Sequence, residues 1–206
     1  NCGAADLSNK LTRKERSEHL HRVIASERFL NKQGLGNEVP FFICPFPAGE
    51  GLSMIEDRLD LIERLGHAGV TVLDLSLYDL SMELLAERGI FEDLLSAEPD
   101  MDKSELRELL QGVLDIQEHL VPKIAEAIMS KPHDVIFLSG VGEVYPYIRS
   151  HNVLNNLQST AKDKPTVLFF PGTYTHSTVT GGSLELFGLL PDDKYYRAFN
   201  ILNYEV

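Results

Sequence analysis

The chain has 206 residues, of which 43% are hydrophobic, and carries a formal net charge of −12. These values are typical of a globular domain with a sizeable core, and they exclude wholesale disorder. Every apolar run is shorter than the roughly 18 residues of a membrane helix, and the acidic balance disfavours generic nucleic-acid binding. The two cysteines lie far apart without metal-binding spacing, which predicts a cytoplasmic protein in which Cys44 is a buried apolar side chain.

Short apolar runs alternate with segments of helical periodicity along the chain. The apolar runs predict strands at residues 41–44, 70–77, 134–138, 166–170 and 196–202. The periodic segments predict helices at residues 6–30, 53–65, 80–89, 90–96, 102–117, 122–131 and 146–157. Because strands that alternate with helices imply crossover connections, we expect an α/β fold with three layers. Its mostly parallel sheet would have about five strands flanked by helices.

Local patterns predict where three helices begin. Ser53 and an acidic residue three positions later match a capping box, and the apolar stripe of that helix would comprise Ile55, Leu59, Ile62 and Leu65. Asp102 can begin the long helical stretch that follows. Pro122 fits the first turn of a helix but not its interior, so it is expected to begin a second helix or to kink the first.

One domain over residues 1–206 is the economical organisation, because the sequence has no internal repeat, low-complexity tract or convincing linker. The first residues are mixed and polar and do not resemble a signal peptide. The sequence begins without a methionine. We therefore expect residues 1–11 to be disordered or of cloning origin.

Basic residues crowd the N-terminal segment of this otherwise acidic chain. They are Lys10, Arg13, Lys14, Arg16, Arg22 and Arg28. Such a group could dock an acidic partner or RNA. The simpler interpretation, which we favour, is the solvated face of a helix.

The loop after the first strand has the position of a phosphate-binding loop but lacks its residues. That motif requires a glycine, four residues, and then Gly-Lys-Ser/Thr. In register, Phe46 replaces the first glycine and Leu52 replaces the lysine. Ser139 follows the third strand where a magnesium-binding aspartate would be expected. We therefore expect a loosely P-loop-like fold without an intact phosphate-binding motif, and we do not expect ATP hydrolysis.

Other templates for catalysis and metal binding also fail. The sequence has no Gly-x-Ser-x-Gly elbow, no His-Glu-x-x-His and no Cys/His cluster at zinc spacing. Gly140 and Gly142 lack the third glycine of a dinucleotide fingerprint, because Tyr145 holds that position. Asp192 and Asp193 could bind a cation but are more typical of a turn. We expect no metal and no cofactor, and the sequence favours a non-enzymatic role.

The remaining candidate site lies after the third strand. A helix beginning near Pro146 would place Arg149, Asn152 and Asn156 on one face, with its N-terminus at the ligand edge of the sheet. An anion or a partner peptide could bind there. In the alternative, slightly favoured interpretation, Arg149 pairs with a carboxylate such as Glu143 and the neighbouring polar residues satisfy buried backbone. The candidate binding residues are Gly140, Gly142, Glu143, Arg149, His151, Asn152, Asn156 and Arg197.

The string GVGEVYPYIRSHNVLNNL at residues 140–157 is long and distinctive. Three further pieces keep the same order, at residues 34–42, 169–174 and 186–199. Together they resemble the BrxB family of bacterial BREX phage-defence systems, from about residue 12 to the C-terminus. The family has no established catalytic residue, so none can be carried over to this chain.

The resemblance implies a cytoplasmic accessory component of a system that restricts phage replication and methylates host DNA. It also implies other BREX components as partners, first among them the larger PglZ-type protein. Two functions follow as hypotheses. The first is a non-catalytic adaptor that acts through protein–protein interaction. The second is a nucleotide- or nucleic-acid-binding regulator that uses the loops at the carboxyl end of the sheet, and a hydrolase with an unrecognised site is a third option.

Overall fold

The computed structural model describes residues 11–36, 38–177, 181–192 and 198–206. The expectation for residues 1–11 therefore lies outside the described residues, except at Leu11, which is half-buried and packs against the core. The elements around that core alternate between helices and strands over most of the chain.

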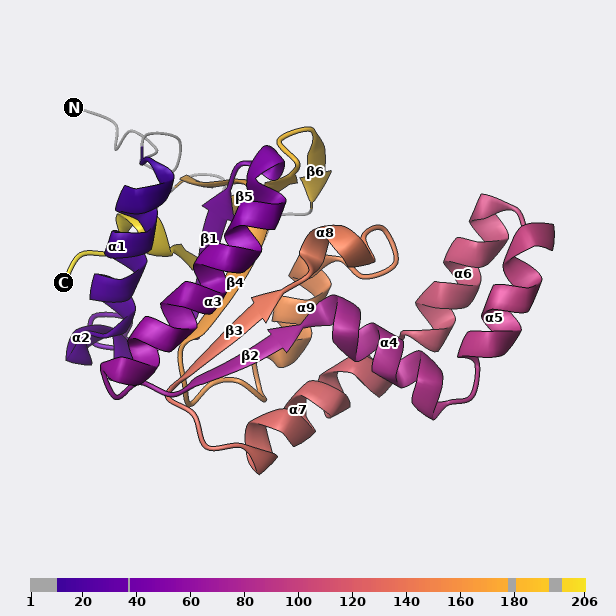
Figure 1. The fold of residues 1–206 in the computed structure, drawn as a ribbon, viewed down its shortest axis with the longest axis horizontal. Coiled ribbons are helices and arrows are strands. Elements are labelled where there is room, and N and C mark those ends of the chain that lie inside the picture. The colour runs from indigo at the N-terminus through magenta and orange to yellow at the C-terminus, as the bar shows by residue number, and fades with distance from the viewer. Residues whose placement is uncertain (1–10, 37, 178–180, 193–197) are drawn as a thin grey trace.

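A mostly parallel sheet runs through the molecule, as expected (Figure 1). Its main strands lie in the order β2–β3–β4–β1–β7, and every neighbouring pair on this path is parallel. The end of β4 continues into an antiparallel hairpin with β5, which pairs in turn with β6. The strands are β1 (Phe41–Phe46), β2 (Val72–Ser76), β3 (Val135–Ser139), β4 (Thr166–Ser177), β5 (Gly181–Leu186), β6 (Leu190–Asp192) and β7 (Ala198–Asn200).

The central strands read as apolar runs because both of their faces are covered. All residues of β1 and β3 are buried. We expected the first strand to end at residue 44, but β1 continues through Pro45 to Phe46. β7 pairs only with residues 41–43 of β1, so Pro45 lies where β1 has a neighbouring strand on one side alone. Such an edge tolerates a residue without an N–H group.

Three helices cover one face of the sheet, namely α1 (Arg13–Ile24), α2 (Glu27–Leu30) and α3 (Gly51–His67). The single helix predicted for residues 6–30 is divided, because the Ser26 hydroxyl accepts a hydrogen bond from the Phe29 amide and caps α2. The predicted capping box at Ser53 is also wrong. α3 begins at Gly51, after the short helix η2 (Ala48–Glu50), and the Ser53 hydroxyl donates to the Glu50 carbonyl instead.

Three other helices pack against the opposite face, α4 (Leu77–Glu87), α7 (Val121–Ser130) and α9 (Ser150–Leu157). Between α4 and α7 the chain forms a helical arm that extends away from the sheet (Figure 1). Asp102 caps α6 through a capping box with Glu105, and Pro122 lies in the first turn of α7, as expected. The remaining helical elements are α5 (Phe91–Ala97), η3 (Glu98–Asp100), α6 (Lys103–Val113), η4 (Ile116–Leu120), α8 (Val141–Val144) and η5 (Ile201–Asn203).

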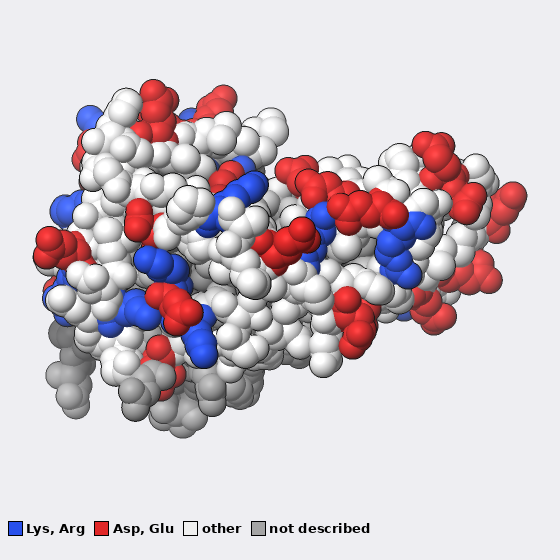
Figure 2. Space-filling model, turned by 90° about the horizontal axis from the view of Figure 1, so that it is seen from below, with Lys and Arg blue, Asp and Glu red and all other residues white. Residues whose placement is uncertain are grey.

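The acidic charge of the chain is concentrated in this helical region. Residues 77–130 contain 13 acidic and 4 basic residues, so they carry −9 of the net −12. Figure 2 shows the acidic side chains over the arm, with only a few lysines and arginines among them. Within the described part of the chain, no helix combines the length and apolar character that crossing a membrane requires.

Candidate functional site

The helix that the sequence predicts at residues 146–157 forms as α9, but it begins at Ser150 and not near Pro146. α8 ends at Val144, and the chain then turns before α9 begins at Ser150. Ile148 is buried and its amide donates to the Val144 carbonyl at 3.0 Å, which holds this turn. Arg149 is consequently the extended residue that precedes α9, and the predicted three-residue stripe on the helix is reduced to Asn152 and Asn156.

The polar residues of α9 point to a structural as well as a surface role. His151 is buried, whereas Asn152 is exposed. The side-chain amide of Asn156 donates to the Asn152 carbonyl at 2.8 Å, a contact within one turn of the helix. Arg149, which precedes α9, is half-buried.

Arg197 and Asp193 lie outside the described residues, and the side chain of Asp192 is likewise not described.

A cleft of about 690 Å³ opens where β1, β2 and β3 end and where β4 leaves the parallel part of the sheet, and we refer to it as the carboxyl-edge cleft. Its walls come from the loop after β1 with the first turns of α3, and from the start of α4. The segment 139–143 after β3 and the turn after β5 complete them. Of the candidate residues, Gly140, Gly142 and Glu143 line this cleft. The candidates at positions 149, 151, 152 and 156 do not.

The glycines after β3 are explained by close approach of the chain to itself. Gly140 has φ +81°, and a Cβ there would come within 3.0 Å of the Tyr78 amide nitrogen and 3.2 Å of the Ser76 hydroxyl. A Cβ on Gly142 would lie 3.2 Å from the ring of Phe187. The two glycines therefore let the end of β3 pack against the start of α4 and against the turn after β5.

Phe187 has an unusual backbone conformation for a residue that lines the cleft. Its φ is +56°, a conformation that is rare for a bulky residue and is of order 1–3 kcal/mol unfavourable. The Phe187 amide donates to the Pro171 carbonyl at 2.7 Å, which fixes the turn. The ring lies over Gly142 and remains partly exposed in the cleft. Sequence reasoning did not single out this residue, although the following Gly188 is a turn signal.

α3 exposes three large apolar residues, of which Leu52 and Ile55 line the cleft and Leu59 does not. We expected Ile55 and Leu59 to lie in the buried stripe of this helix, and that expectation is wrong. Leu52 is 85% exposed, Ile55 43% and Leu59 54%. The buried residues are Met54, Leu61 and Leu65. α3 carries more apolar residues than its contact with the sheet can cover, and periodicity alone cannot tell which of them face solvent.

The charges of the cleft are mostly acidic. Arg58 of α3 is the only lysine or arginine among the described residues that line it, and it forms an ion pair with Asp74 of β2. Asp79 and Glu143 also line the cleft. Within the described parts of the chain, neither of these two carboxylates forms an ion pair. A cation that is already neutralised and two available carboxylates make this cleft unfavourable for an anionic ligand.

The position of a phosphate-binding loop is occupied by β1, η2 and the start of α3, in strand–loop–helix order. Phe46 and Leu52, which replace the glycine and the lysine of the motif, both line the cleft. Cys44 is buried in β1, and burial raises the pKa of its thiol to about 12, so it is not a reactive thiolate at neutral pH. Over the described residues, no group of three or more His, Cys, Asp and Glu side chains could hold a metal ion.

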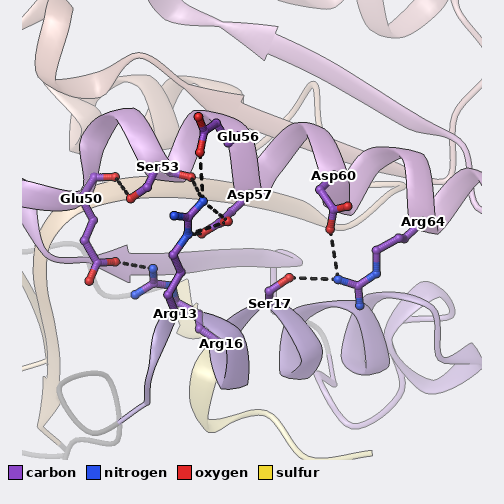
Figure 3. A network of polar contacts seen from close by, with 9 residues as sticks. All are labelled: Arg13, Arg16, Ser17, Glu50, Ser53, Glu56, Asp57, Asp60 and Arg64. Carbon is purple, nitrogen blue, oxygen red and sulfur yellow. Dashed lines mark hydrogen bonds and ion pairs between the residues drawn. The ribbon is translucent and has the colours of Figure 1, made fainter.

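The basic N-terminal segment is engaged on the other side of α3 (Figure 3). Arg13 Nε donates to both carboxylate oxygens of Asp57 at 2.8 and 2.7 Å, and its guanidinium also reaches Glu56 at 3.1 Å. These hydrogen bonds raise the pKa of Arg13 above its ordinary value, and the bond to Asp57 makes the larger contribution. Farther along α1, the Ser17 hydroxyl accepts a hydrogen bond of 3.0 Å from Arg64 of α3.

Arg16 is the most deeply buried basic residue of α1. Its side chain is 3% exposed and forms an ion pair with Glu50 of η2. Arg16 therefore ties α1 to the loop that follows β1 and lines the cleft. Lys14 pairs with Glu18 at 3.8 Å, so this cation is also engaged within the chain. The described part of the basic cluster is thus used largely for intramolecular contacts, rather than as a free patch.

The sequence is similar to proteins of one family. The family model of the BREX protein BrxB matches residues 73–201. A BREX protein BrxB from Bacillus cereus (strain H3081.97) is 32% identical over 193 residues, which cover 92% of this chain and 97% of that protein. Another, from Escherichia coli O9:H4 (strain HS), is 29% identical over 187 residues, covering 91% and 90%. No solved structure matches the chain.

Proposed function

The chain belongs to the BrxB family, and we propose that it is an accessory, non-catalytic adaptor of a BREX anti-phage defence system. Family membership makes it a component of a BREX system. The adaptor role goes further and means that the chain binds other BREX proteins without itself transforming a substrate. We place this role in the cytoplasm.

The observation that carries the proposal is the carboxyl-edge cleft. In open α/β folds this edge is where ligands bind. Here the two positions that would serve a phosphate group carry Phe46 and Leu52, and the walls expose large apolar side chains. Exposed apolar surface of this kind is typical of sites that bind other proteins. The segment 140–143 and its neighbours in the cleft are therefore our first candidate for the docking surface.

A second candidate surface is the exposed side of α9. Asn152 is exposed there and does not line the cleft. An Asn152→Ala variant separates the two surfaces because it leaves the cleft unchanged. If α9 is the docking surface, this variant weakens assembly. If the cleft is the docking surface, assembly is unchanged.

The partner that we propose is the PglZ-type protein of the same system. The test mixes the purified chain with the purified PglZ-type protein, and in parallel with each other BREX protein, at micromolar concentrations. We expect co-elution in size-exclusion chromatography and a binding isotherm in titration calorimetry with the PglZ-type protein. If no BREX component forms a complex under these conditions, the adaptor role is wrong.

The competing function is a regulator that binds a nucleotide or a nucleic acid. It is favoured by the position of the cleft at the carboxyl ends of parallel strands. It is disfavoured by the acidic charges of the cleft and by the engagement of Arg13 and Arg16 within the chain. Thermal-shift measurements with nucleotides and oligonucleotides discriminate the two, because a ligand at 100 times its dissociation constant stabilises by about 2.7 kcal/mol. We expect no shift.

A further inference from the structure

We infer that the carboxyl-edge cleft is a groove for one kind of protein segment, with large apolar side chains beside a lysine or arginine. The inference rests on the proposed adaptor function and specifies the chemistry of the partner. Three features of the cleft carry it: its exposed apolar walls, the fixed position of Phe187, and its charge.

The apolar walls are contributed by separate elements that meet at the cleft. Leu52 and Ile55 are one turn apart on α3 and so lie on the same side of that helix. Tyr78 from α4 and Phe187 from the turn after β5 are the other large exposed apolar residues. Single exposed apolar residues are ordinary, but several around one concave surface indicate a contact site for apolar groups.

Phe187 is held in place before any partner binds. Its rare positive φ is imposed by the turn after β5 and by the hydrogen bond from its amide to Pro171. Gly142, which has no side chain, lets the ring approach the segment after β3. Unfavourable backbone conformations of this kind cluster at ligand-binding sites. A residue whose backbone is already fixed loses less conformational entropy when a partner packs against it.

The charge of the groove selects among possible occupants. Asp79 and Glu143 make no ion pair within the described residues, whereas Arg58 is paired with Asp74. The groove also adjoins the helical region that carries most of the negative charge of the chain. An occupant with phosphates would be repelled, and a lysine or arginine would be attracted to the two carboxylates. An apolar segment with an adjacent basic residue satisfies both properties of the groove.

The apolar part of the inference is tested with Leu52→Glu against Leu59→Glu. Both leucines are exposed on α3, but only Leu52 lines the cleft. Affinity for the purified PglZ-type protein, or for whichever BREX protein binds the wild-type chain, is measured by titration calorimetry. We expect Leu52→Glu to weaken binding at least about tenfold and Leu59→Glu to change it less than about twofold. Circular dichroism and thermal unfolding verify that both variants are folded.

The charge part is tested with Glu143→Lys against Glu63→Lys. Glu63 is exposed on α3 and does not line the cleft, so the two variants change the net charge equally. We expect only Glu143→Lys to weaken binding, by about fivefold or more, and we expect added salt to weaken wild-type binding more than that of Glu143→Gln. Equal effects of the two lysine variants would mean that net charge, and not this groove, attracts the partner.

The outcomes separate this inference from the proposed function. If the wild-type chain binds no BREX protein, both are overturned. If it binds and Leu52→Glu binds equally well, the adaptor function stands and the groove is excluded as its docking site. If Leu52→Glu alters only self-association in sedimentation analysis, the occupant is a second copy of this chain. Stabilisation by nucleotides that is lost in a cleft variant would likewise overturn a protein occupant.

Discussion

The two sides of helix α3 differ in how they use their charges. Toward α1, its carboxylates bind Arg13, and Arg16 reaches the adjoining Glu50. Toward the cleft, α3 presents exposed apolar residues, and the nearby carboxylates Asp79 and Glu143 form no ion pair within the described residues. The charges on the first side are paired within the chain, whereas the second side is available to another molecule. Charge in the sequence therefore indicates a binding surface only where the fold leaves it unpaired.

The largest expected effect distinguishes the buried face of α3 from its face in the cleft. Met54 is buried in the core below the cleft, and two residues earlier Leu52 is almost fully exposed. We expect Met54→Ala to lower the free energy of unfolding by roughly 3 kcal/mol, because it leaves a cavity. Leu52→Ala should change it by less than about 0.5 kcal/mol. Urea denaturation monitored by circular dichroism measures both values, and similar losses would mean that Leu52 also serves the core.

The next effect concerns the buried ion pair of the α1 side. Glu50→Gln leaves the buried guanidinium of Arg16 without its carboxylate. We expect a loss of about 2 kcal/mol, below the 3–5 kcal/mol of fully buried pairs because a third of the Glu50 side chain is exposed. Glu56→Gln is the control, since Glu56 is mostly exposed, and it should have little effect. Equal stabilities of the two variants in urea would contradict the structural role of Arg16.

A smaller effect is expected when one negative charge next to the cleft is removed. Asp74→Asn removes the partner of Arg58, with a loss of about 1 kcal/mol in the free energy of unfolding. The freed arginine should also give the cleft a salt-sensitive affinity for pyrophosphate that is higher than the affinity of the wild-type chain. Titration calorimetry with pyrophosphate measures it. If wild type and variant bind pyrophosphate equally, paired charge is not what excludes anions from the cleft.

The smallest effect is a pH dependence at the start of α1. The Thr12 hydroxyl and amide donate to the Glu15 carboxylate, and these hydrogen bonds lower its pKa. The carboxylate therefore stabilises the fold at pH values above its unfolded pKa of about 4.3, and this contribution disappears as the pH falls through the lower folded pKa. Glu15→Gln keeps a capping side chain without this titration. We expect wild type to unfold at a higher temperature at neutral pH and the difference to vanish in acid. A constant difference would exclude this linkage.

Much of the fold follows from local sequence. The central strands are predicted because burial on both faces requires continuous apolar runs such as residues 135–138. The start of α6 is predicted because Asp102 satisfies its free amides within the next turn. The turn at residues 145–149 is not predicted, because burial of Ile148 decides it and burial is a property of the whole fold.

The site is predictable only in part, for a similar reason. Gly140 and Gly142 mark the end of a strand in the sequence, and the structure places them in the cleft. Arg13 meets Asp57 across 44 positions, so nothing near Arg13 in the sequence reveals its partner. The exposed Leu52 and Ile55 resemble core residues in any periodicity pattern, and the positive φ of Phe187 depends on the turn that holds it. Long-range pairing and exposed apolar groups are the features that sequence reasoning missed.

Hydrogen exchange on the complex tests most directly whether the cleft, and not the α1 side, is the docking surface. The amides of the chain are followed by mass spectrometry with and without the purified PglZ-type protein. We predict slower exchange in the complex for residues 48–55, 139–143 and 185–188, and unchanged exchange for residues 13–24. Protection confined to residues 13–24, with the cleft segments unchanged, would contradict the account.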